Sequence, residues 1–343
     1  MTTGLLPIHN YGMNSPNTDK PVVVTLFAPE DGPPPGLEPL SAYARIVYAS
    51  DRQDLLAAIS DADVLLVTDF RTSLLQEAWP QAKKVQWVHA TSAGVDAILF
   101  PGLIDSAVPV TNARGIFDNA IAEYVLGLIL SFAKDFMGTV ALQHERRWRH
   151  RDTERIQGRR ALVVGAGSIG RAIARLLKAA GLEVAGVARH YREDDPDFGT
   201  VHATQALHDL LADADYVVVA APLTDSTRGM FGAGQFACMK PTARFINIGR
   251  GPIVQTDALV AALRDGRPGG AALDVFEQEP LPPEHPLWQM PQVIVSAHMA
   301  GDFIGWREAL SAQFIDNFQR WRQGEALNNL VDKRRGYGPA HQE

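Results

Sequence analysis

Residues 161–177 read "ALVVGAGSIGRAIARLL". An apolar run at 161–164 leads into three glycines spaced G-x-G-x-x-G, and a helical pattern of apolar residues follows. A strand, a glycine turn and a helix in this order are typical of the first unit of a dinucleotide-binding sheet.

The three glycines of this turn have separate physical reasons. Gly165 permits the tight turn that leaves the strand, and Gly167 lets the backbone approach a pyrophosphate closely. Gly170 lets the helix pack against the strand. Ser168 and Ile169 stand at the helix N-terminus, where backbone N–H groups and the helix dipole attract anions. The turn predicts a dinucleotide phosphate site, with a turn that binds no ligand as the alternative.

The end of the next predicted strand, residues 184–187, is basic. Ala188 is followed by three residues that can be positively charged: Arg189, His190 and Arg192. A site for NAD(H) usually has a carboxylate here for the ribose 2′-hydroxyl, but Glu183 stands at the start of the strand. A guanidinium binds a 2′-phosphate dianion through two hydrogen bonds. We therefore predict NADP(H) as the preferred cofactor, and NAD(H) or a merely solvated basic surface as the alternatives.

Short apolar strands alternate with helical patterns along most of the chain. The predicted strands are 22–27, 44–48, 64–68 and 85–89, then 161–164, 184–187, 216–220, 244–248, 271–274 and 293–295. This alternation predicts an α/β fold with two doubly wound parallel sheets, the second with the strand count of a complete dinucleotide-binding sheet. The last helical pattern, residues 302–321, would return to pack on the first domain.

Composition and charge exclude several classes of function. The 343 residues carry a net charge of −7, which argues against a protein that binds nucleic acid by its overall charge. A single cysteine, Cys238, fits a reducing cytoplasm, and ten histidines without ligand spacing predict no metal. The most apolar segment, residues 120–133, is too short to span a membrane and is predicted to pack between domains or subunits.

Chemically useful side chains follow several of the later predicted strands. In chain order they are Arg250, Asp274, Glu279 and His298. Doubly wound sheets bind ligands at the carboxyl ends of their strands. A carbonyl that accepts a hydride needs a proton, which a histidine oriented by a carboxylate supplies, and an arginine fork suits a substrate carboxylate. The set predicts reduction of a 2-oxoacid; a surface ion pair, a loop charge and a core histidine are the alternatives for Arg250, Glu279 and His298.

Four motifs together resemble the D-isomer-specific 2-hydroxyacid dehydrogenases: "GAGSIGRAIARLL", "NIGRGPIVQTDAL", "GAALDVFEQEPLP" and "AHMAG". The resemblance implies a Rossmann dinucleotide-binding domain, residues 114–302, inserted in a flavodoxin-like substrate domain, residues 21–113 and 303–335. Residues 1–20 would be a flexible tail. It also implies a homodimer and a site in the cleft between the two domains.

The resemblance also implies roles for individual residues. Arg250 would bind the substrate carboxylate and polarise the carbonyl, and His298, paired with Glu279, would be the acid/base. Backbone N–H groups of Ala93 and Gly94, in "ATSAGVDAI", would point at the carboxylate. The further cofactor contacts that the motifs imply are Pro222, Ile248, Asp274, His298 and Ala300.

The basic ending "VARHYR" is similar to that of NADPH-using glyoxylate/hydroxypyruvate reductases. We therefore expect an NAD(P)-dependent oxidoreductase that reduces 2-oxoacids to D-2-hydroxyacids. The alternative is a cofactor-sensing binding protein of the same fold, like the transcriptional corepressors related to this family. One departure from the family pattern is Ala297, where a proline commonly precedes the histidine, so the loop that carries His298 is expected to be less rigid.

Overall fold

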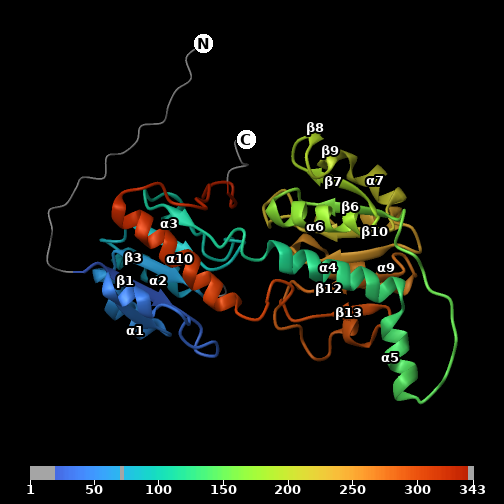
Figure 1. The fold of residues 1–343 in the computed structure, drawn as a ribbon, viewed down its shortest axis with the longest axis horizontal. Helices are drawn as coiled ribbons and strands as arrows, with labels where there is room; N and C mark the ends of the chain where they lie inside the picture. The colour runs from blue at the N-terminus through green and yellow to red at the C-terminus, as the bar shows by residue number, and fades with distance from the viewer. Residues whose placement is uncertain (1–19, 70–72, 339–343) are drawn as a thin grey trace, which may run out of the picture. The chain divides into compact units, whose positions relative to one another are not determined.

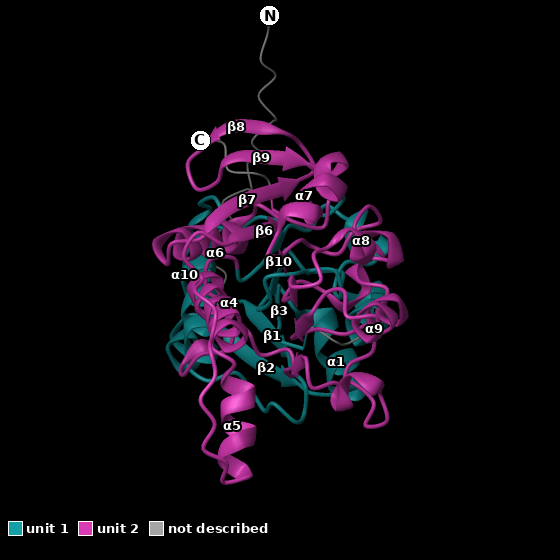
Figure 2. Cartoon of the chain, turned by 90° about the vertical axis from the view of Figure 1, so that its right-hand side faces the viewer, with its two compact units in different colours: residues 1–113, 307–334 teal, residues 114–306, 335–343 magenta. Residues whose placement is uncertain are grey.

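The structure is a computed structural model that describes residues 20–69 and 73–338, and it divides into two compact units (Figures 1 and 2). Unit 1 comprises residues up to 113 together with 307–334, and unit 2 comprises 114–306 together with the residues from 335 onward. Except for Lys20, the predicted tail at residues 1–20 lies outside the described residues. We propose that unit 1 is the substrate domain and unit 2 the dinucleotide-binding domain.

Unit 1 is built on a parallel five-stranded sheet with the order β2-β1-β3-β4-β5. Its strands are β1 (Val22–Leu26), β2 (Arg45–Ala49), β3 (Val64–Val67), β4 (Trp87–Ala90) and β5 (Val110–Thr111). Four of them match the predicted strands closely. The fifth was not predicted, because two residues form no readable pattern of alternation.

Helices and short 3-10 turns cover the sheet of unit 1. They are η1 (Glu38–Ala42), α1 (Arg52–Ala58), η2 (Ile59–Asp61), α2 (Leu74–Ala78), η3 (Trp79–Gln81), α3 (Pro101–Ile104) and α10 (Trp306–Gln323). From α10, Phe314 and Phe318 are fully buried in a cluster with Trp87 of β4, and the Phe314 and Trp87 rings stack at 5.3 Å. The prediction that the last helix packs on the first domain is therefore confirmed.

A histidine lies in the same buried cluster. His89 of β4 is fully buried, and its Nδ1 is 2.8 Å from the Thr111 hydroxyl, which also accepts a hydrogen bond from the Trp87 indole. Its Nε2 has no hydrogen-bond partner among the described residues. Burial lowers the pKa of His89 to about 3, so this imidazole is neutral in the folded unit.

Unit 2 contains an eight-stranded sheet with the order β13-β12-β11-β10-β6-β7-β9-β8, parallel except for β8. Its strands are β6 (Arg160–Val164), β7 (Glu183–Ala188), β8 (Arg192–Asp195), β9 (Gly199–Ala203), β10 (Tyr216–Val219), β11 (Arg244–Asn247), β12 (Gly270–Leu273) and β13 (Val293–Val295). The predicted α/β class with two parallel-sheet domains is confirmed.

The predicted count of six strands in this sheet was wrong. The strand beside β7 is β9, "GTVHA", and the antiparallel β8 completes a hairpin with it. Both were missed because they are short and β8, "REDD", is entirely charged while β9 mixes polar with apolar residues, so neither shows the apolar run of a buried parallel strand.

The helical segments of unit 2 are α4 (Asp118–Ala133), α5 (Phe136–His144), α6 (Ser168–Ala179), η4 (Thr204–Ala206), α7 (Leu207–Asp213), α8 (Ala233–Cys238), η5 (Gly251–Ile253), α9 (Thr256–Arg264) and η6 (Pro286–Gln289). The apolar helix α4 packs beside α6 (Figure 1) and buries Val125 and Ile129. In the described part of the chain, no single helix has the length and apolarity to cross a membrane; α4 and α5, bent by 62°, meet that test only as a pair.

Candidate active site

The glycine turn of unit 2 has the geometry that a dinucleotide requires. Gly165 has φ +112°, and a Cβ there would lie 2.6 Å from the backbone of Ala220. A Cβ at Gly170 would lie 1.9 Å from the Gly165 carbonyl oxygen, so this glycine lets α6 pack against the turn. By contrast, nothing lies within 4 Å of a Cβ at Gly167, the N-cap of α6. The turn therefore leaves space beside the helix N-terminus, as a bound pyrophosphate would need.

The basic residues after β7 lie at the same end of the sheet as this turn, because β6 and β7 are parallel. Arg189 and His190 are exposed, and the Arg189 guanidinium lies 6.0 Å from the ring centre of Tyr337. Arg192 donates from Nη2 to the carbonyl oxygen of Ala166, inside the turn, at 3.3 Å. Glu183 begins β7 and is exposed at the opposite edge, 3.5 Å from Arg160. Glu183 therefore lies at the other end of β7 from the glycine turn.

His298 and Glu279 form a direct pair in unit 2. Nδ1 of His298 is 2.7 Å from Oε2 of Glu279, and both side chains are about a quarter to a third exposed. Burial raises the pKa of Glu279, but hydrogen bonds from His298 and the Phe276 backbone, with the charges of His298 and Arg250, outweigh burial and lower it. Because the Glu279 carboxylate only accepts, Nδ1 carries a proton, so a proton transfer to a substrate would use the other imidazole nitrogen, Nε2.

The loop that carries His298 is held by Asp274, at the end of β12. The His298 backbone N–H donates to the Asp274 carbonyl, and the N–H groups of Met299 and Ala300 donate to its carboxylate at 2.9 Å each. The Ser296 hydroxyl donates to the same carboxylate at 2.7 Å. His298 has φ +53°, a left-handed conformation that side chains rarely adopt, so these bonds hold a strained backbone. They fix the loop although Ala297 stands where the family pattern has proline.

Arg250 lies in the neighbouring loop, directly after β11. Its Nη1 donates to the Gly249 carbonyl at 2.8 Å, and the Asn247 amide donates to the Arg250 carbonyl at 3.2 Å. The next residue, Gly251, is packed so tightly that a Cβ would lie 1.8 Å from the Phe276 carbonyl carbon. This contact brings the Arg250 loop against the loop of Glu279, which explains why the arginine charge acts on the glutamate pKa.

The remaining predicted cofactor contacts lie at this same end of the sheet. Ile248 is nearly buried directly after β11, and Pro222, after β10, is exposed. Ser168 begins α6, and its hydroxyl donates to Asp118 at 3.2 Å; Ile169 follows it and is half-buried. The structure thus gathers the candidates of unit 2 at the carboxyl ends of its parallel strands.

Ala93 and Gly94 lie in unit 1, in the loop that follows β4. The Ala93 carbonyl accepts from the Asn112 amide and the Gly94 carbonyl accepts from the Ser92 hydroxyl, each at 2.6 Å. Neither backbone N–H of Ala93 or Gly94 has an acceptor among the described residues. Two unpaired neighbouring N–H groups are a local anion-binding feature.

A model of the family described as "D-isomer specific 2-hydroxyacid dehydrogenase, NAD binding domain" matches residues 126–300, about half of the chain. The chain belongs to this family. A glyoxylate reductase from Thermofilum pendens is 32% identical over 91% of this dehydrogenase and 94% of that relative. The dehydrogenase is therefore an oxidoreductase that depends on NAD(P), as the sequence predicted.

Solved structures of the family match the fold of this dehydrogenase. A D-isomer specific 2-hydroxyacid dehydrogenase from Xanthobacter autotrophicus, in complex with NADPH and MES, has a TM-score of 0.80 at 31% identity. The match covers 93% of this chain and 100% of the Xanthobacter chain. An NADPH-dependent glyoxylate/hydroxypyruvate reductase from Sinorhizobium meliloti, in complex with NADP and sulfate, has the same TM-score and coverages at 28% identity.

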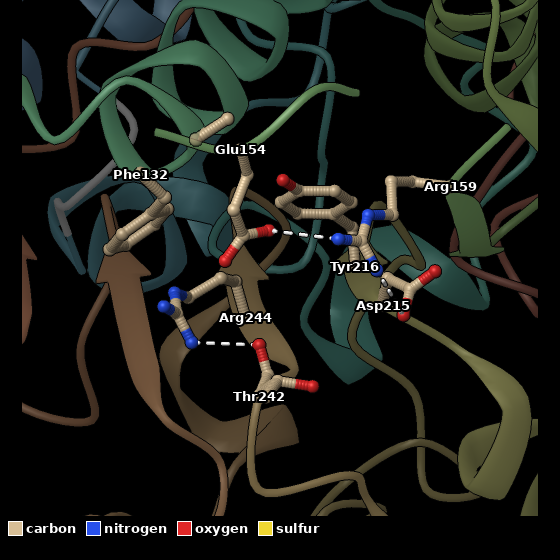
Figure 3. Close-up of a pocket in the computed structure, with 8 residues that line it drawn as sticks. Phe132, Glu154, Arg159, Asp215, Tyr216, Thr242 and Arg244 are labelled. Carbon is tan, nitrogen blue, oxygen red and sulfur yellow. Dashed lines mark hydrogen bonds and ion pairs between the residues drawn. The ribbon is translucent and has the colours of Figure 1, made fainter. Parts of the chain in front are cut away.

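A pocket of the dehydrogenase lies at the amino ends of β6, β10 and β11, away from the glycine turn (Figure 3). Its charged lining consists of Glu154, Arg159, Asp215 and Arg244. Arg159 lies 3.6 Å from Glu154 and 4.0 Å from Asp215. The two guanidiniums are matched by two carboxylates, so no net charge selects a ligand, and none of the predicted site residues lines this pocket.

Proposed function

We propose that this dehydrogenase reduces small 2-oxoacids of the glyoxylate and hydroxypyruvate type to D-2-hydroxyacids, with NADPH as the preferred reductant. The observation that supports this most is the His298–Glu279 pair at 2.7 Å, at the same end of the sheet as the glycine turn. The names of the Thermofilum pendens and Sinorhizobium meliloti relatives support the same substrate class.

In this proposal His298 donates a proton from Nε2 to the substrate oxygen as the carbonyl becomes an alcohol. Glu279 stays anionic and accepts a hydrogen bond from the Nδ1–H group, which fixes the orientation of the imidazole. Asp274 acts one step further away, because it holds the backbone of residues 298–300. In the reverse direction the same His298 nitrogen accepts the proton of the hydroxyl group.

The proposed ligands of the substrate carboxylate are Arg250 and the backbone N–H groups of Ala93 and Gly94. Arg250 offers a guanidinium for the carboxylate and the adjacent carbonyl oxygen, and its positive charge opposes the charge that develops on that oxygen. Ala93 and Gly94 offer the two backbone N–H groups without acceptors. A carboxylate beside the carbonyl is thus the feature by which the enzyme would select its substrates.

The residues of the glycine turn fit the proposed cofactor. Gly165, Gly167, Ser168, Ile169 and Gly170 would hold its pyrophosphate. The basic group Arg189, His190 and Arg192 would bind the 2′-phosphate. Pro222, Ile248, Asp274, His298 and Ala300 would surround the nicotinamide portion. When bound, the reduced nicotinamide is the source of the hydride for the carbonyl carbon.

We also propose that the enzyme is a homodimer that pairs through unit 2. The helix α5 exposes three large apolar side chains, Phe136, Met137 and Val140, each about half exposed. Apolar residues that line one exposed helix face are typical of a surface that another protein covers. Light scattering of the purified protein tests this: a monomer mass would contradict it. A cytoplasmic location stays a prediction from the single cysteine.

The decisive test of the reaction follows NADPH absorbance with glyoxylate, hydroxypyruvate, pyruvate and a branched 2-oxoacid, and with an aldehyde that lacks the carboxylate. We expect turnover with 2-oxoacids and none with the aldehyde. The variants His298→Ala and Arg250→Ala should lose turnover by at least about a hundredfold while their circular dichroism stays unchanged. If His298→Ala keeps most of the activity, the proposed proton donor is wrong.

A further inference from the structure

Asp195, the last residue of β8, carries a buried carboxylate beside the proposed 2′-phosphate site. Its side chain is 1% exposed and accepts hydrogen bonds from three parts of unit 2. Arg171 of α6 donates two, at 2.9 and 2.8 Å, and Arg192 of the β8–β9 hairpin donates one, at 2.7 Å. The backbone N–H groups of Asp197 and Phe198 complete the set.

These donors keep Asp195 ionised. Burial raises the pKa of this carboxyl, but the hydrogen bonds from the two arginines and the two backbone N–H groups outweigh burial and bring the pKa to about 2. Asp197 lies next to it and pairs with Arg171 and Arg175. The cluster thus holds the guanidiniums of Arg171, Arg175 and Arg192 and the carboxylates of Asp195 and Asp197. Its net charge is one positive, which suits an anionic ligand.

The contacts of Arg192 orient its guanidinium toward the glycine turn. Nε donates to Asp195, and Nη2 donates to the carbonyl of Ala166, between the two first glycines of the turn. These two bonds occupy one edge of the planar guanidinium. The other edge, made by Nη1 and the second N–H of Nη2, has no hydrogen bond within the described part of the chain. An edge of this kind is the fork that binds a phosphate through two parallel hydrogen bonds.

We infer that Asp195 is a positioning residue for cofactor choice: it holds Arg192 so that the open edge of the guanidinium faces the 2′-phosphate. This inference rests on the proposed preference for NADP(H). An arginine with a flexible stem loses side-chain entropy when it binds a phosphate, and a buried carboxylate that fixes it beforehand removes part of that cost. Asp195 would therefore favour NADP(H) over NAD(H) without touching either.

A purely structural role for Asp195 makes a different prediction. If the carboxylate only ties the hairpin to α6, its loss should weaken the binding of both cofactors alike. Asp197 is a matched control, because it also pairs with Arg171 of α6 but makes no contact with Arg192. The inference uses the hydrogen bond from Arg192, which Asp195 accepts and Asp197 does not.

The experiment measures the dissociation constants of NADP⁺ and NAD⁺ by calorimetry, for the full chain and without substrate. For Asp195→Asn we expect NADP⁺ to bind about tenfold more weakly, as is typical for loss of a charged hydrogen bond, while NAD⁺ changes less than about twofold. Asp197→Asn should leave the ratio of the two constants as in the wild type. Asp195→Glu keeps the charge and is the second variant: it should weaken NADP⁺ binding less than Asp195→Asn does.

A double variant tests whether Asp195 acts through Arg192. Arg192→Gln should weaken NADP⁺ binding, and adding Asp195→Asn to it should change the constant by less than about twofold, because the residue to be positioned is gone. The inference fails if the effects multiply, if both cofactors weaken equally, or if Asp195→Asn strengthens NADP⁺ binding. A wild-type enzyme that binds NAD⁺ at least as tightly as NADP⁺ would instead refute the proposed cofactor preference itself.

Discussion

Acidification between pH 7 and pH 5 is expected to destabilise unit 1 through His89. The imidazole is fully buried against the rings of Trp87 and Phe314, and burial lowers its pKa to about 3. In the unfolded chain the same side chain has the ordinary value, 6.5. The neutral form is the one that the fold accepts, so the free energy of unfolding falls as the pH drops below 6.5.

The size of this effect follows from the two pKa values. Below pH 6.5 the unfolded chain binds a proton that the folded unit does not bind, and each pH unit then costs about 1.4 kcal/mol. Between pH 7 and pH 5 the loss from this one residue is about 2 kcal/mol, because the folded site stays neutral at both pH values. Below pH 3 the folded site titrates as well, and the loss stops growing.

The assay compares the wild type with His89→Gln in urea denaturation at pH 7, 6 and 5, followed by tryptophan fluorescence. Glutamine keeps a polar group near Thr111 but does not titrate. The difference in unfolding free energy between variant and wild type should therefore move by about 2 kcal/mol in favour of the variant from pH 7 to pH 5. The control is His144→Gln, exposed at the end of α5, which should leave the pH dependence as in the wild type. Stability differences for His89→Gln that do not change with pH would refute the reasoning.

Two further changes test the site and the fold. Glu279→Gln removes the carboxylate that orients the His298 imidazole through Nδ1, so kcat for reduction should fall about ten- to a hundredfold while the circular dichroism stays unchanged; a kcat within about twofold of the wild type would contradict the pairing. The Lys333 ammonium donates to the backbone carbonyls of Leu103, Ser106 and Val108, at 2.9, 2.6 and 2.9 Å. Lys333→Met removes these hydrogen bonds and should lower the unfolding free energy by about 1–3 kcal/mol in urea denaturation. Lys20→Met, which loses one exposed hydrogen bond, is its control and should cost less than about 0.5 kcal/mol; equal losses would show that the three bonds of the half-buried Lys333 add no stability.

The apolar strands and the glycine turn were predictable from the sequence because each depends on a few adjacent residues. The pairing of Glu279 with His298 was predicted only through the resemblance, since 19 residues and the end of a strand separate them. The hairpin of β8 and β9 was missed for a related reason. Its stability comes from Phe198 and Asp195, which are buried by contacts far away in the sequence.

Asp195 shows why the rest of the site could not be predicted. It stands in the run "EDDPD", residues 193–197, which has the composition of a solvated acidic loop. Three of its four acidic residues are at least partly exposed, and only Asp195 is buried, against two arginines. Charge alone cannot single out that position, because burial depends on where α6 and the hairpin meet. The burial of His89 could not be predicted either, because a neutral imidazole can stand among the apolar residues of a buried strand without changing the sequence pattern.

The close packing at Gly251 limits how this enzyme can be altered. The loops of Arg250 and Glu279 touch through bare backbone at that point, so even an added methyl group would force them apart. Changes that enlarge the substrate pocket in the laboratory, or during divergence of new specificities, must therefore come from positions outside this contact. The backbone contact thus fixes the spacing of the loops that carry Arg250 and Glu279, and a change of substrate preference is left to the surrounding side chains.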